Sequence, residues 1–344
     1  METWNLFEFL IRDRAKFESF TIMRDIFIRA KSPLRGFLPW VKKLRYGAWK
    51  FQDRLGVRLV ISGGKVKFMD VELEFPEGVG LHYSTPLYWN GPDAYECQTS
   101  RTIALLAGKS ELFLDIGSNV GIYAIYVGKR FPQVKIFAFE PIPAIWQKNR
   151  RFHQANQLPD DTVFNLALGD REGPQTIFLP VHETGWEEEQ TATLRQDLWQ
   201  TREQHVEKIE IQCTTLDAFA ASHEPMPGLC LLKIDVENYE SAVLRGGKNF
   251  IAARRPWIVC EILSGQDIDV STKTRKNNND EVAALIHEFG YAVFAITSHG
   301  LFRMTINDFS RPREFKDFLL VPAERISDQV LYLTPGDAAG LFDS

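Results

Sequence analysis

The sequence predicts an α/β fold, with a parallel sheet covered by helices, and three observations support this class. From about Ala94, apolar strands, turns and helices alternate along the chain. Two later runs, Leu229 to Asp235 and Trp257 to Leu263, have the apolar density of central parallel strands. A tight turn with two glycines joins the first strand of this region to its helix. Sheets of this class bind ligands at the carboxyl ends of their strands.

The composition is that of an ordinary globular protein. The chain has 344 residues, 44% hydrophobic and 25% charged, which suffices for one large domain and an attachment. The net charge of −5 gives no general attraction to a phosphate backbone, so a nucleic-acid partner is disfavoured. The four cysteines form no C-x-x-C pair, and neither a zinc site nor a disulfide framework is expected. The sequence shows no signal-peptide pattern, which makes a cytoplasmic location the default.

Residues 1–56 are expected to form a basic amphipathic helical extension. Residues 1–58 contain 13 Lys or Arg and 6 Asp or Glu. Apolar residues recur at helical intervals from Trp4 to about Lys31 and again from Phe37 to Phe51. We favour helices that pack on their own protein, and keep peripheral contact with the inner face of a membrane as the alternative.

Three further segments complete the predicted organisation. Residues 57–93 form a β-hairpin and loop region, in which Gly63-Gly64 joins two short strands and a loop covers 76–92. The main domain spans residues 94–325, with a polar surface loop over 264–280 and a final helix and strands over 281–322. Residues 326–344 are a C-terminal tail.

The strongest local signal is the stretch Asp115-Ile-Gly117-Ser118-Asn119-Val-Gly121 between a strand and a helix. Gly117 and Gly121 suit a turn in which the backbone adopts positive φ and approaches a ligand. Glu140 ends the next strand, at the distance expected of an acid that accepts hydrogen bonds from ribose hydroxyls. The turn, the helix and the acid together indicate a site for a nucleoside-containing cofactor.

The chemistry of this turn favours S-adenosylmethionine over NAD. A dinucleotide fingerprint reads G-x-G-x-x-G and places a pyrophosphate at the helix N-terminus, whereas this turn reads G-x-x-x-G and follows an acid. Asp115 would repel a phosphate but suits the ammonium and sulfonium groups of S-adenosylmethionine. A P-loop is excluded because no G-K-[ST] sequence follows a glycine cluster.

The chain also resembles the FkbM-type methyltransferases across about residues 94–322. The resemblance rests on six stretches in order, FLDIGSNVGIY, FAFEPIP, LALGDREG, TTLDAF, LLKIDVENYESAVLRGG and IVCEIL. It implies a seven-stranded, Rossmann-like class I methyltransferase sheet, S-adenosylmethionine as cofactor, and O-methylation of a sugar or another small metabolite. The acceptor is accordingly a small molecule or a glycan.

The resemblance extends the predicted cofactor site, and one position departs from the family pattern. The expected cofactor-binding residues are Asp115, Gly117, Ser118, Asn119, Gly121, Glu140, Pro141, Ala167 and Asp235. The family usually has glycine where this chain has Asn238. Because asparagine tolerates the left-handed conformation, we expect the turn there to survive.

The candidate catalytic groups gather at the end of the strand that starts near Leu229. The two-residue period puts Lys233, Asp235 and Glu237 on one face of an otherwise apolar strand. Charges in a buried strand are costly unless they are paired or used. We expect Asp235 to touch the methyl donor or the acceptor, with Lys233 and Glu237 beside it. A purely structural Lys233–Asp235 ion pair is the alternative.

Other titratable residues have subordinate expected roles. His182 is the best histidine candidate for a base, because it opens an insertion over about 181–206 where a lid would lie. Glu261 would face the same crevice as Asp235 and Glu237, and their oxygens could ligate a divalent cation, but no metal is predicted. Asp217 is expected to cap the helix that begins there.

Two other functions stay open. A nucleic-acid methyltransferase is the nearest enzyme alternative, yet the sequence has no N/D-P-P-Y/F motif and its catalytic part is acidic. A protein that binds S-adenosylmethionine without catalysis is favoured only by Asn238. The predicted site keeps its acids and glycines, which argues against a loss of catalysis.

Overall fold

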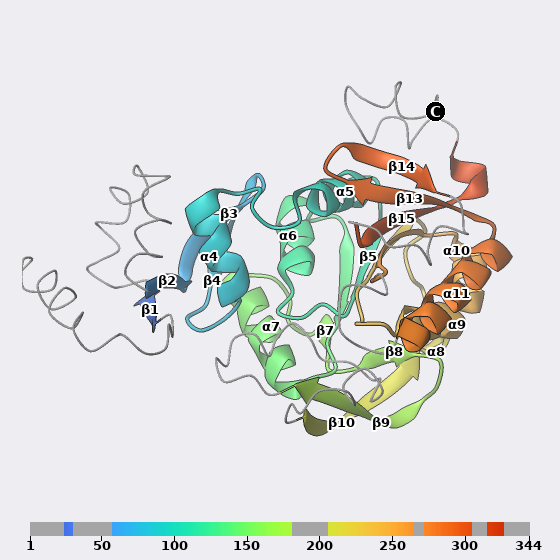
Figure 1. Cartoon of the computed structure of the whole chain (residues 1–344), viewed down its shortest axis with the longest axis horizontal. Helices are drawn as coiled ribbons and strands as arrows, with labels where there is room; N and C mark the ends of the chain where they lie inside the picture. Colours follow the sequence, from blue (N-terminus) through green and yellow to red (C-terminus); the bar gives the residue numbers. More distant parts are fainter. Residues whose placement is uncertain (1–23, 30–56, 181–205, 264–271, 305–314, 327–344) are drawn as a thin grey trace, which may run out of the picture.

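The computed structural model describes residues 24–29, 57–180, 206–263, 272–304 and 315–326, and it centres on one mixed eight-stranded sheet (Figure 1). The strand order across the sheet is β14-β13-β15-β12-β11-β5-β6-β7. Its strands are β5 (Leu112–Ile116), β6 (Lys135–Phe139), β7 (Val163–Phe164), β11 (Cys230–Ile234), β12 (Trp257–Glu261), β13 (Tyr291–Thr297), β14 (Gly300–Met304) and β15 (Asp317–Pro322).

The topology of this sheet confirms the predicted fold class. Strands β12, β11, β5, β6 and β7 are parallel neighbours, and β15 runs antiparallel between β12 and β13. Without β14, the strands lie in the chain order 6-7-5-4-1-2-3, so the order reverses between β5 and β11. The prediction of seven strands is one short. The extra strand, β14, forms an antiparallel hairpin with β13 at the edge of the sheet.

Helices cover both faces of the sheet, and each face has its own apolar core. The first core includes Phe113 and Leu231 and is covered by α5 (Cys97–Ala107), α6 (Ile122–Arg130) and α7 (Pro143–Ala155). The second includes Leu114 and Leu232 and is covered by α8 (Leu216–Ser222), α9 (Glu240–Gly246), α10 (Lys248–Arg254) and α11 (Thr272–Phe289). Successive strand residues point to opposite faces, which explains the near-continuous apolar runs.

A separate small sheet follows β7 along the chain. It consists of β8 (Ala167–Gly169), β9 (Gly173–Pro180) and β10 (Val206–Thr215), with β10 in the middle. A short 3-10 helix, η6 (Ala323–Arg325), follows β15. Among the described helices, none combines the length and the apolar character that crossing a membrane requires.

The N-terminal part differs from its prediction in three respects. Residues Arg24–Arg29, expected to be helical, form strand β1, which pairs in parallel with β2 (Val57–Ser62). The hairpin joins β3 (Gly64–Phe68) to β4 (Val71–Phe75), so Gly63-Gly64 is not its turn. The expected loop 76–92 contains helix α4 (Leu81–Asn90). Short runs with β-branched and aromatic residues fit helix and strand periods equally well, and the pairing partner decides between them.

Two predictions in the main domain are also wrong. The polar segment 264–280 was expected to be a loop, but α11 begins at Thr272, and its buried Asn278 and Asn279 make hydrogen bonds to neighbouring elements. Thr215, not Asp217, caps α8, because its Oγ1 accepts the Ala218 N–H at 3.0 Å. The Asp217 carboxylate instead accepts the N–H groups of Asn249 and Phe250 at the start of α10.

The β3–β4 hairpin packs on the helical layer of the main sheet. Phe75 is 1% exposed, and its ring centroid lies 4.4 Å from that of Phe152 on α7. Phe68 makes an edge contact with Tyr126 on α6 at 5.4 Å. The predicted boundary at residue 94 stays a prediction, but the hairpin shares the core of the segment that follows it.

We therefore expect Phe75→Ala to lower the free energy of unfolding by about 3–5 kcal/mol, the usual cost of truncating a buried phenylalanine. Urea denaturation followed by tryptophan fluorescence measures this change. Leu105→Ala is the matched control, since Leu105 is exposed and should change stability by less than about 0.5 kcal/mol. Equal stabilities for Phe75→Ala and the wild type would show that the hairpin does not stabilise the domain.

Candidate active site

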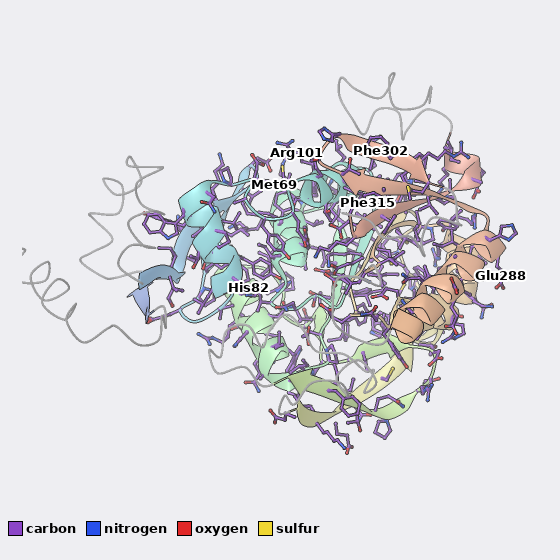
Figure 2. The ribbon with its side chains drawn as sticks, in the orientation of Figure 1. Met69, His82, Arg101, Glu288, Phe302 and Phe315 are labelled. Carbon is purple, nitrogen blue, oxygen red and sulfur yellow. The ribbon has the colours of Figure 1, made fainter. Side chains whose placement is uncertain are left out.

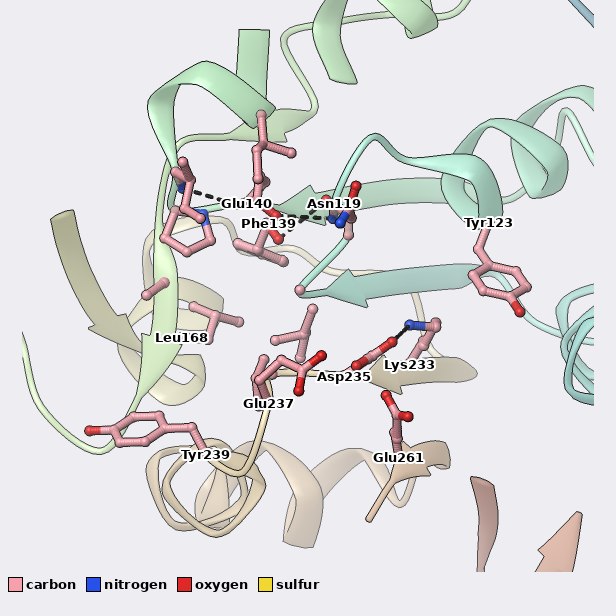
Figure 3. Close-up of a pocket in the computed structure, with 18 of the residues that line it drawn as sticks. Asn119, Tyr123, Phe139, Glu140, Leu168, Lys233, Asp235, Glu237, Tyr239 and Glu261 are labelled. Carbon is pink, nitrogen blue, oxygen red and sulfur yellow. Dashed lines mark hydrogen bonds and ion pairs between the residues drawn. The ribbon is translucent and has the colours of Figure 1, made fainter. Parts of the chain in front are cut away.

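A cavity of about 340 Å³ opens at the carboxyl ends of β5, β6 and β11, where the strand order reverses (Figure 3). Reversal of strand order leaves a crevice, because the connections from neighbouring strands go to opposite faces of the sheet. Nine of the predicted site residues line this cavity: Gly117, Ser118, Asn119, Glu140, Pro141, Ala167, Lys233, Asp235 and Glu237. His182 lies outside the described residues.

The turn after β5 has the backbone geometry that its sequence predicts. Gly117 and Gly121 have φ of 77° and 87°, and Asn119 has φ of 52°. A Cβ on Gly117 would collide with the backbone carbonyl oxygen of Asp235. Gly117 is therefore required by the close approach of the turn to β11, as well as by its φ.

A buried asparagine that sequence reasoning missed supports this turn. Asn149 on α7 is fully buried, and its Nδ2 donates to Ser118 Oγ at 3.0 Å and to the Asn119 carbonyl at 2.8 Å. A Cβ on Gly121 would collide with Asn149. Gly121 thus leaves room for the supporting side chain and does not line the cavity, contrary to its predicted contact with the cofactor. Asn149 is far from the turn in sequence, so no local pattern predicts this role.

Glu140 is held in a fixed orientation at the wall of the cavity. It is 5% exposed, and its two carboxylate oxygens accept the N–H groups of Asn119 and Ile142 at 3.0 and 2.9 Å. An ionised carboxylate accepts several hydrogen bonds at once, which suits it to hydroxyl groups. Apolar residues lie next to it on the same wall, namely Ile142, Ile145, Ala167 and Leu168. One acid beside an apolar slot fits a ribose and its base.

Asp115 lies beneath the turn and is not among the residues that line the cavity. It is 1% exposed; Oδ2 accepts the Ala124 N–H at 3.2 Å, and Oδ1 has no hydrogen-bond partner among the described residues. Burial raises the pKa of Asp115 to about 6, against the opposing effect of Lys233. The predicted contact of Asp115 with a cationic cofactor group therefore does not match its position. The Asp115 side chain points to the face of the sheet that α6 covers.

Lys233 and Asp235 form a partly buried ion pair at the end of β11. Lys233 Nζ lies 2.9 Å from Asp235 Oδ2, and 5.2 Å from the ring centroid of Tyr123. Burial alone would raise the pKa of Asp235, but Lys233 and a hydrogen bond with Glu261 outweigh it and hold the pKa below its usual range. The Lys233–Asp235 ion pair, which was the structural alternative to a catalytic role for Asp235, is thus formed. The same carboxylate also lines the cavity.

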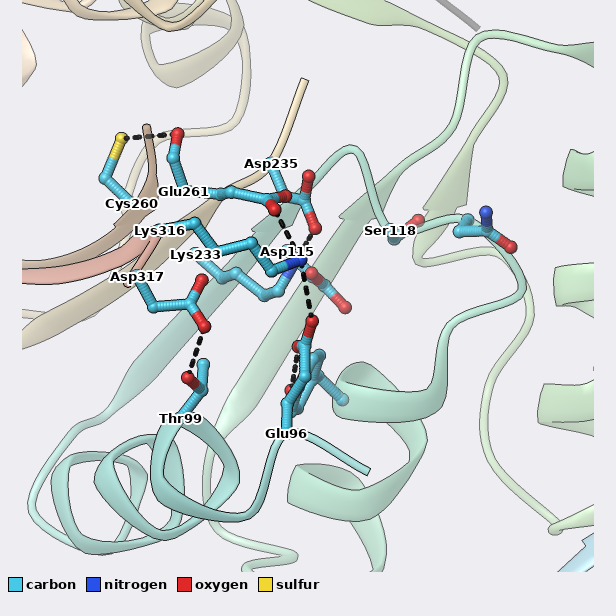
Figure 4. A network of polar contacts seen from close by, with 12 residues as sticks. Glu96, Thr99, Asp115, Ser118, Lys233, Asp235, Cys260, Glu261, Lys316 and Asp317 are labelled. Carbon is cyan, nitrogen blue, oxygen red and sulfur yellow. Dashed lines mark hydrogen bonds and ion pairs between the residues drawn. The ribbon is translucent and has the colours of Figure 1, made fainter. Parts of the chain in front are cut away.

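Glu237 and Glu261 bring two further carboxylates to Asp235. One oxygen from each of the three lies within 4.8 Å of the others. Burial and the charge of Asp235 raise the pKa of Glu261 well above its usual range, and Lys316 Nζ forms an ion pair with it (Figure 4). Three such oxygens are hard ligands suited to Mg²⁺ or Ca²⁺. Lys233 and Lys316 already neutralise two of these carboxylates, and the expectation that no metal binds stays a prediction.

The turn after β11 keeps its shape without the family glycine. Glu237 and Asn238 have φ of 50° and 69°, so Asn238 adopts the left-handed conformation as predicted. The buried Glu240 carboxylate closes the turn, accepting the Asn238 N–H at 3.0 Å and Asn278 Nδ2 at 2.9 Å. Burial raises the pKa of Glu240 to about 7.

Residues 115–293 match the family model described as the methyltransferase FkbM domain. The chain belongs to the FkbM methyltransferase family. Membership confirms the predicted resemblance and S-adenosylmethionine as the cofactor of the family.

Curated relatives of this FkbM family member match part of its length. Methyltransferase 1 of Beauveria bassiana is 25% identical over 142 residues, which are 39% of this chain and 57% of that protein. Methyltransferase sdnD of Sordaria araneosa is 26% identical over 152 residues, 39% of this chain and 59% of that protein. The matched region thus spans less than two thirds of either relative.

Solved structures with detectable likeness include another FkbM methyltransferase. The crystal structure of methyltransferase FkbM from Methylobacillus flagellatus aligns over 62% of this chain and 43% of its own, with 13% identity and a TM-score of 0.36. The S-adenosylhomocysteine-bound methyltransferase of Podospora anserina aligns over 67% of this chain and 81% of its own, with 13% identity and a TM-score of 0.36.

The raised pKa of Glu240 makes the stability of the protein depend on pH. Between about pH 4.5 and pH 7, the Glu240 side chain keeps its proton in the folded protein. In the unfolded chain, where its pKa has the ordinary value of 4.5, it has lost that proton. Wild-type stability therefore loses a contribution as the pH rises through this window. We expect Glu240→Gln, compared with the wild type, to gain roughly 1–3 kcal/mol between pH 5 and pH 8.

Urea denaturation of both proteins at the two pH values measures this difference. Glu72→Gln is the control, because the side chain of Glu72 is 61% exposed and pairs with Lys65 on the surface. A stability difference between Glu240→Gln and the wild type that is the same at both pH values would show that Glu240 is ionised throughout.

Proposed function

We propose that this methyltransferase transfers the methyl group to a hydroxyl of a sugar or another small metabolite. The observation that carries this proposal is the group of three carboxylates, Asp235, Glu237 and Glu261, beside the nucleoside wall of one cavity. An acceptor hydroxyl must lose its proton during transfer, and a carboxylate within reach is the group that takes it. When bound, S-adenosylmethionine supplies a methyl group already activated by its sulfonium.

The remaining work of the protein is alignment and proton transfer. Gly117, Ser118, Asn119, Glu140, Pro141 and Ala167 would hold the nucleoside half of the donor. The methyl group would then lie near the end of β11, where Asp235 and Glu237 line the cavity (Figure 3). Lys233 fixes Asp235 at 2.9 Å and keeps it ionised. Fixing the acceptor in line with the donor replaces a bimolecular encounter by a preset geometry.

The charged residues that line the cavity argue against the alternative of nucleic-acid methylation. The cavity is lined by Glu96, Glu140, Asp235, Glu237 and Glu261, and by two lysines, Lys233 and Lys316. An excess of carboxylates repels phosphate groups and is the reverse of a nucleic-acid groove. An uncharged hydroxyl compound meets no such penalty.

We expect Glu140→Ala to weaken S-adenosylmethionine binding about 10–100-fold, because it removes a charge-assisted hydrogen bond to the ribose. Asp235→Asn should lower methyl transfer by at least about 100-fold. Calorimetry measures the first effect, and transfer of a labelled methyl group to a panel of sugars, amino sugars and polyols measures the second. Glu288→Gln, on the outer side of α11, is the control for both (Figure 2).

Two results would contradict the proposal. The first is donor binding that Glu140→Ala leaves unchanged. The second is methyl transfer to DNA or RNA but to none of the hydroxyl compounds. Donor binding with no transfer to any acceptor class would support the alternative of a binding protein without catalysis.

A further inference from the structure

Part of the cavity wall comes from outside the residues that match the FkbM domain. Tyr83 on α4, Tyr95 and Glu96 before α5, and Lys316 before β15 all line the same cavity as Gly117 and Asp235. The family model covers residues 115–293, so these side chains precede or follow it. Glu96 bonds to Tyr123 and pairs with Lys316, so both lie at the end of the cavity that contains Tyr123. Figure 3 shows Tyr123 and Lys233 at the end away from Glu140 and Leu168.

Glu96 and Lys316 form an ion pair on this wall, held by its neighbours. Lys316 Nζ lies 3.3 Å from Glu96 Oε1 and pairs with Glu261 on its other side (Figure 4). Tyr123 Oη donates to Glu96 Oε2 at 2.8 Å. Glu96 itself has φ of 37°, a conformation that a non-glycine residue adopts only when its surroundings impose it. Both charges are thus fixed in place before any ligand arrives.

The methyl donor carries a matching pair of charges. Its amino-acid end has an ammonium and a carboxylate on one carbon atom, and both need a partner when they leave water. The ribose and base fit the wall of Glu140, Ala167 and Leu168. The amino-acid end then points to the opposite end of the cavity. An anion and a cation fixed side by side there can accept the ammonium and donate to the carboxylate.

We propose that Glu96 and Lys316 bind the amino-acid end of S-adenosylmethionine, Glu96 accepting hydrogen bonds from the ammonium and Lys316 donating to the carboxylate. Lys316 has three N–H donors, so it keeps its bond to Glu261 while it serves the ligand. The assignment rests on the nucleoside site proposed above. Under this assignment, residues in the segments before and after the family domain contact the methyl donor.

The test compares two ligands that share the nucleoside and the sulfur atom. 5′-Methylthioadenosine lacks the amino-acid end with its ammonium and carboxylate, and its sulfur is a neutral thioether where the donor has a sulfonium. We expect Glu96→Gln and Lys316→Met each to weaken S-adenosylmethionine binding about 10–100-fold in calorimetry, the effect of losing one charge-assisted hydrogen bond. Binding of 5′-methylthioadenosine should change by less than about twofold, since it makes no such bond.

The exposed pair of Lys248 and Glu288, at 3.0 Å, supplies the matched controls Lys248→Met and Glu288→Gln. These variants should leave both affinities unchanged. Binding of 5′-methylthioadenosine also verifies that the cavity of each variant is folded.

Four outcomes would overturn the assignment. Equal losses of affinity for the two ligands would mean that Glu96 and Lys316 only shape the cavity. Unchanged affinity for S-adenosylmethionine would mean that its amino-acid end binds elsewhere. A wild-type protein that binds neither ligand would refute the nucleoside site itself, and a wild-type protein that binds only 5′-methylthioadenosine would refute the amino-acid site alone.

Discussion

The approach of the Gly117 turn to the end of β11 is the contact on which the site depends. The Asp235 N–H donates to the Ile116 carbonyl at 3.0 Å, and no Cβ fits between Gly117 and the Asp235 carbonyl. This contact joins two strands that are far apart in sequence and neighbours in the sheet. It sets the nucleoside wall and the carboxylates of β11 and β12 around one cavity. Any side chain at position 117 would separate them.

The same junction gathers charges that a protein interior does not accept singly. Asp115, Lys233 and Glu261 are buried on one face of three adjacent strands, and they are joined by Lys316, which precedes β15 in the same sheet, and by Glu96, which precedes α5. Removing one partner of a buried ion pair costs about 3–5 kcal/mol, so such a network is stable only as a whole. Its cost to stability is consistent with a site that must present fixed charges to a charged ligand.

The site also extends beyond the domain that defines the family. Tyr95 and Glu96 precede α5, and Lys316 follows the matched residues, yet they share the cavity with Gly117 and Asp235. Helix α5 reaches it because it packs on β12 and β13, and β15 reaches it because it lies between these two strands in the central sheet.

The sequence by itself determined the features that are local. The strand–turn–helix around Gly117, the acid at the end of β6 and the apolar strands β11 and β12 each follow from a short run of residues, because φ, ψ preferences and burial period act over a few positions. Only the tertiary structure decided which side chains meet. It buried Asp115, gave Asp217 to α10 in place of α8, turned residues 24–29 into a strand and brought Lys316 to Glu96. These outcomes depend on packing between segments that are distant in sequence, which no short run of residues can predict.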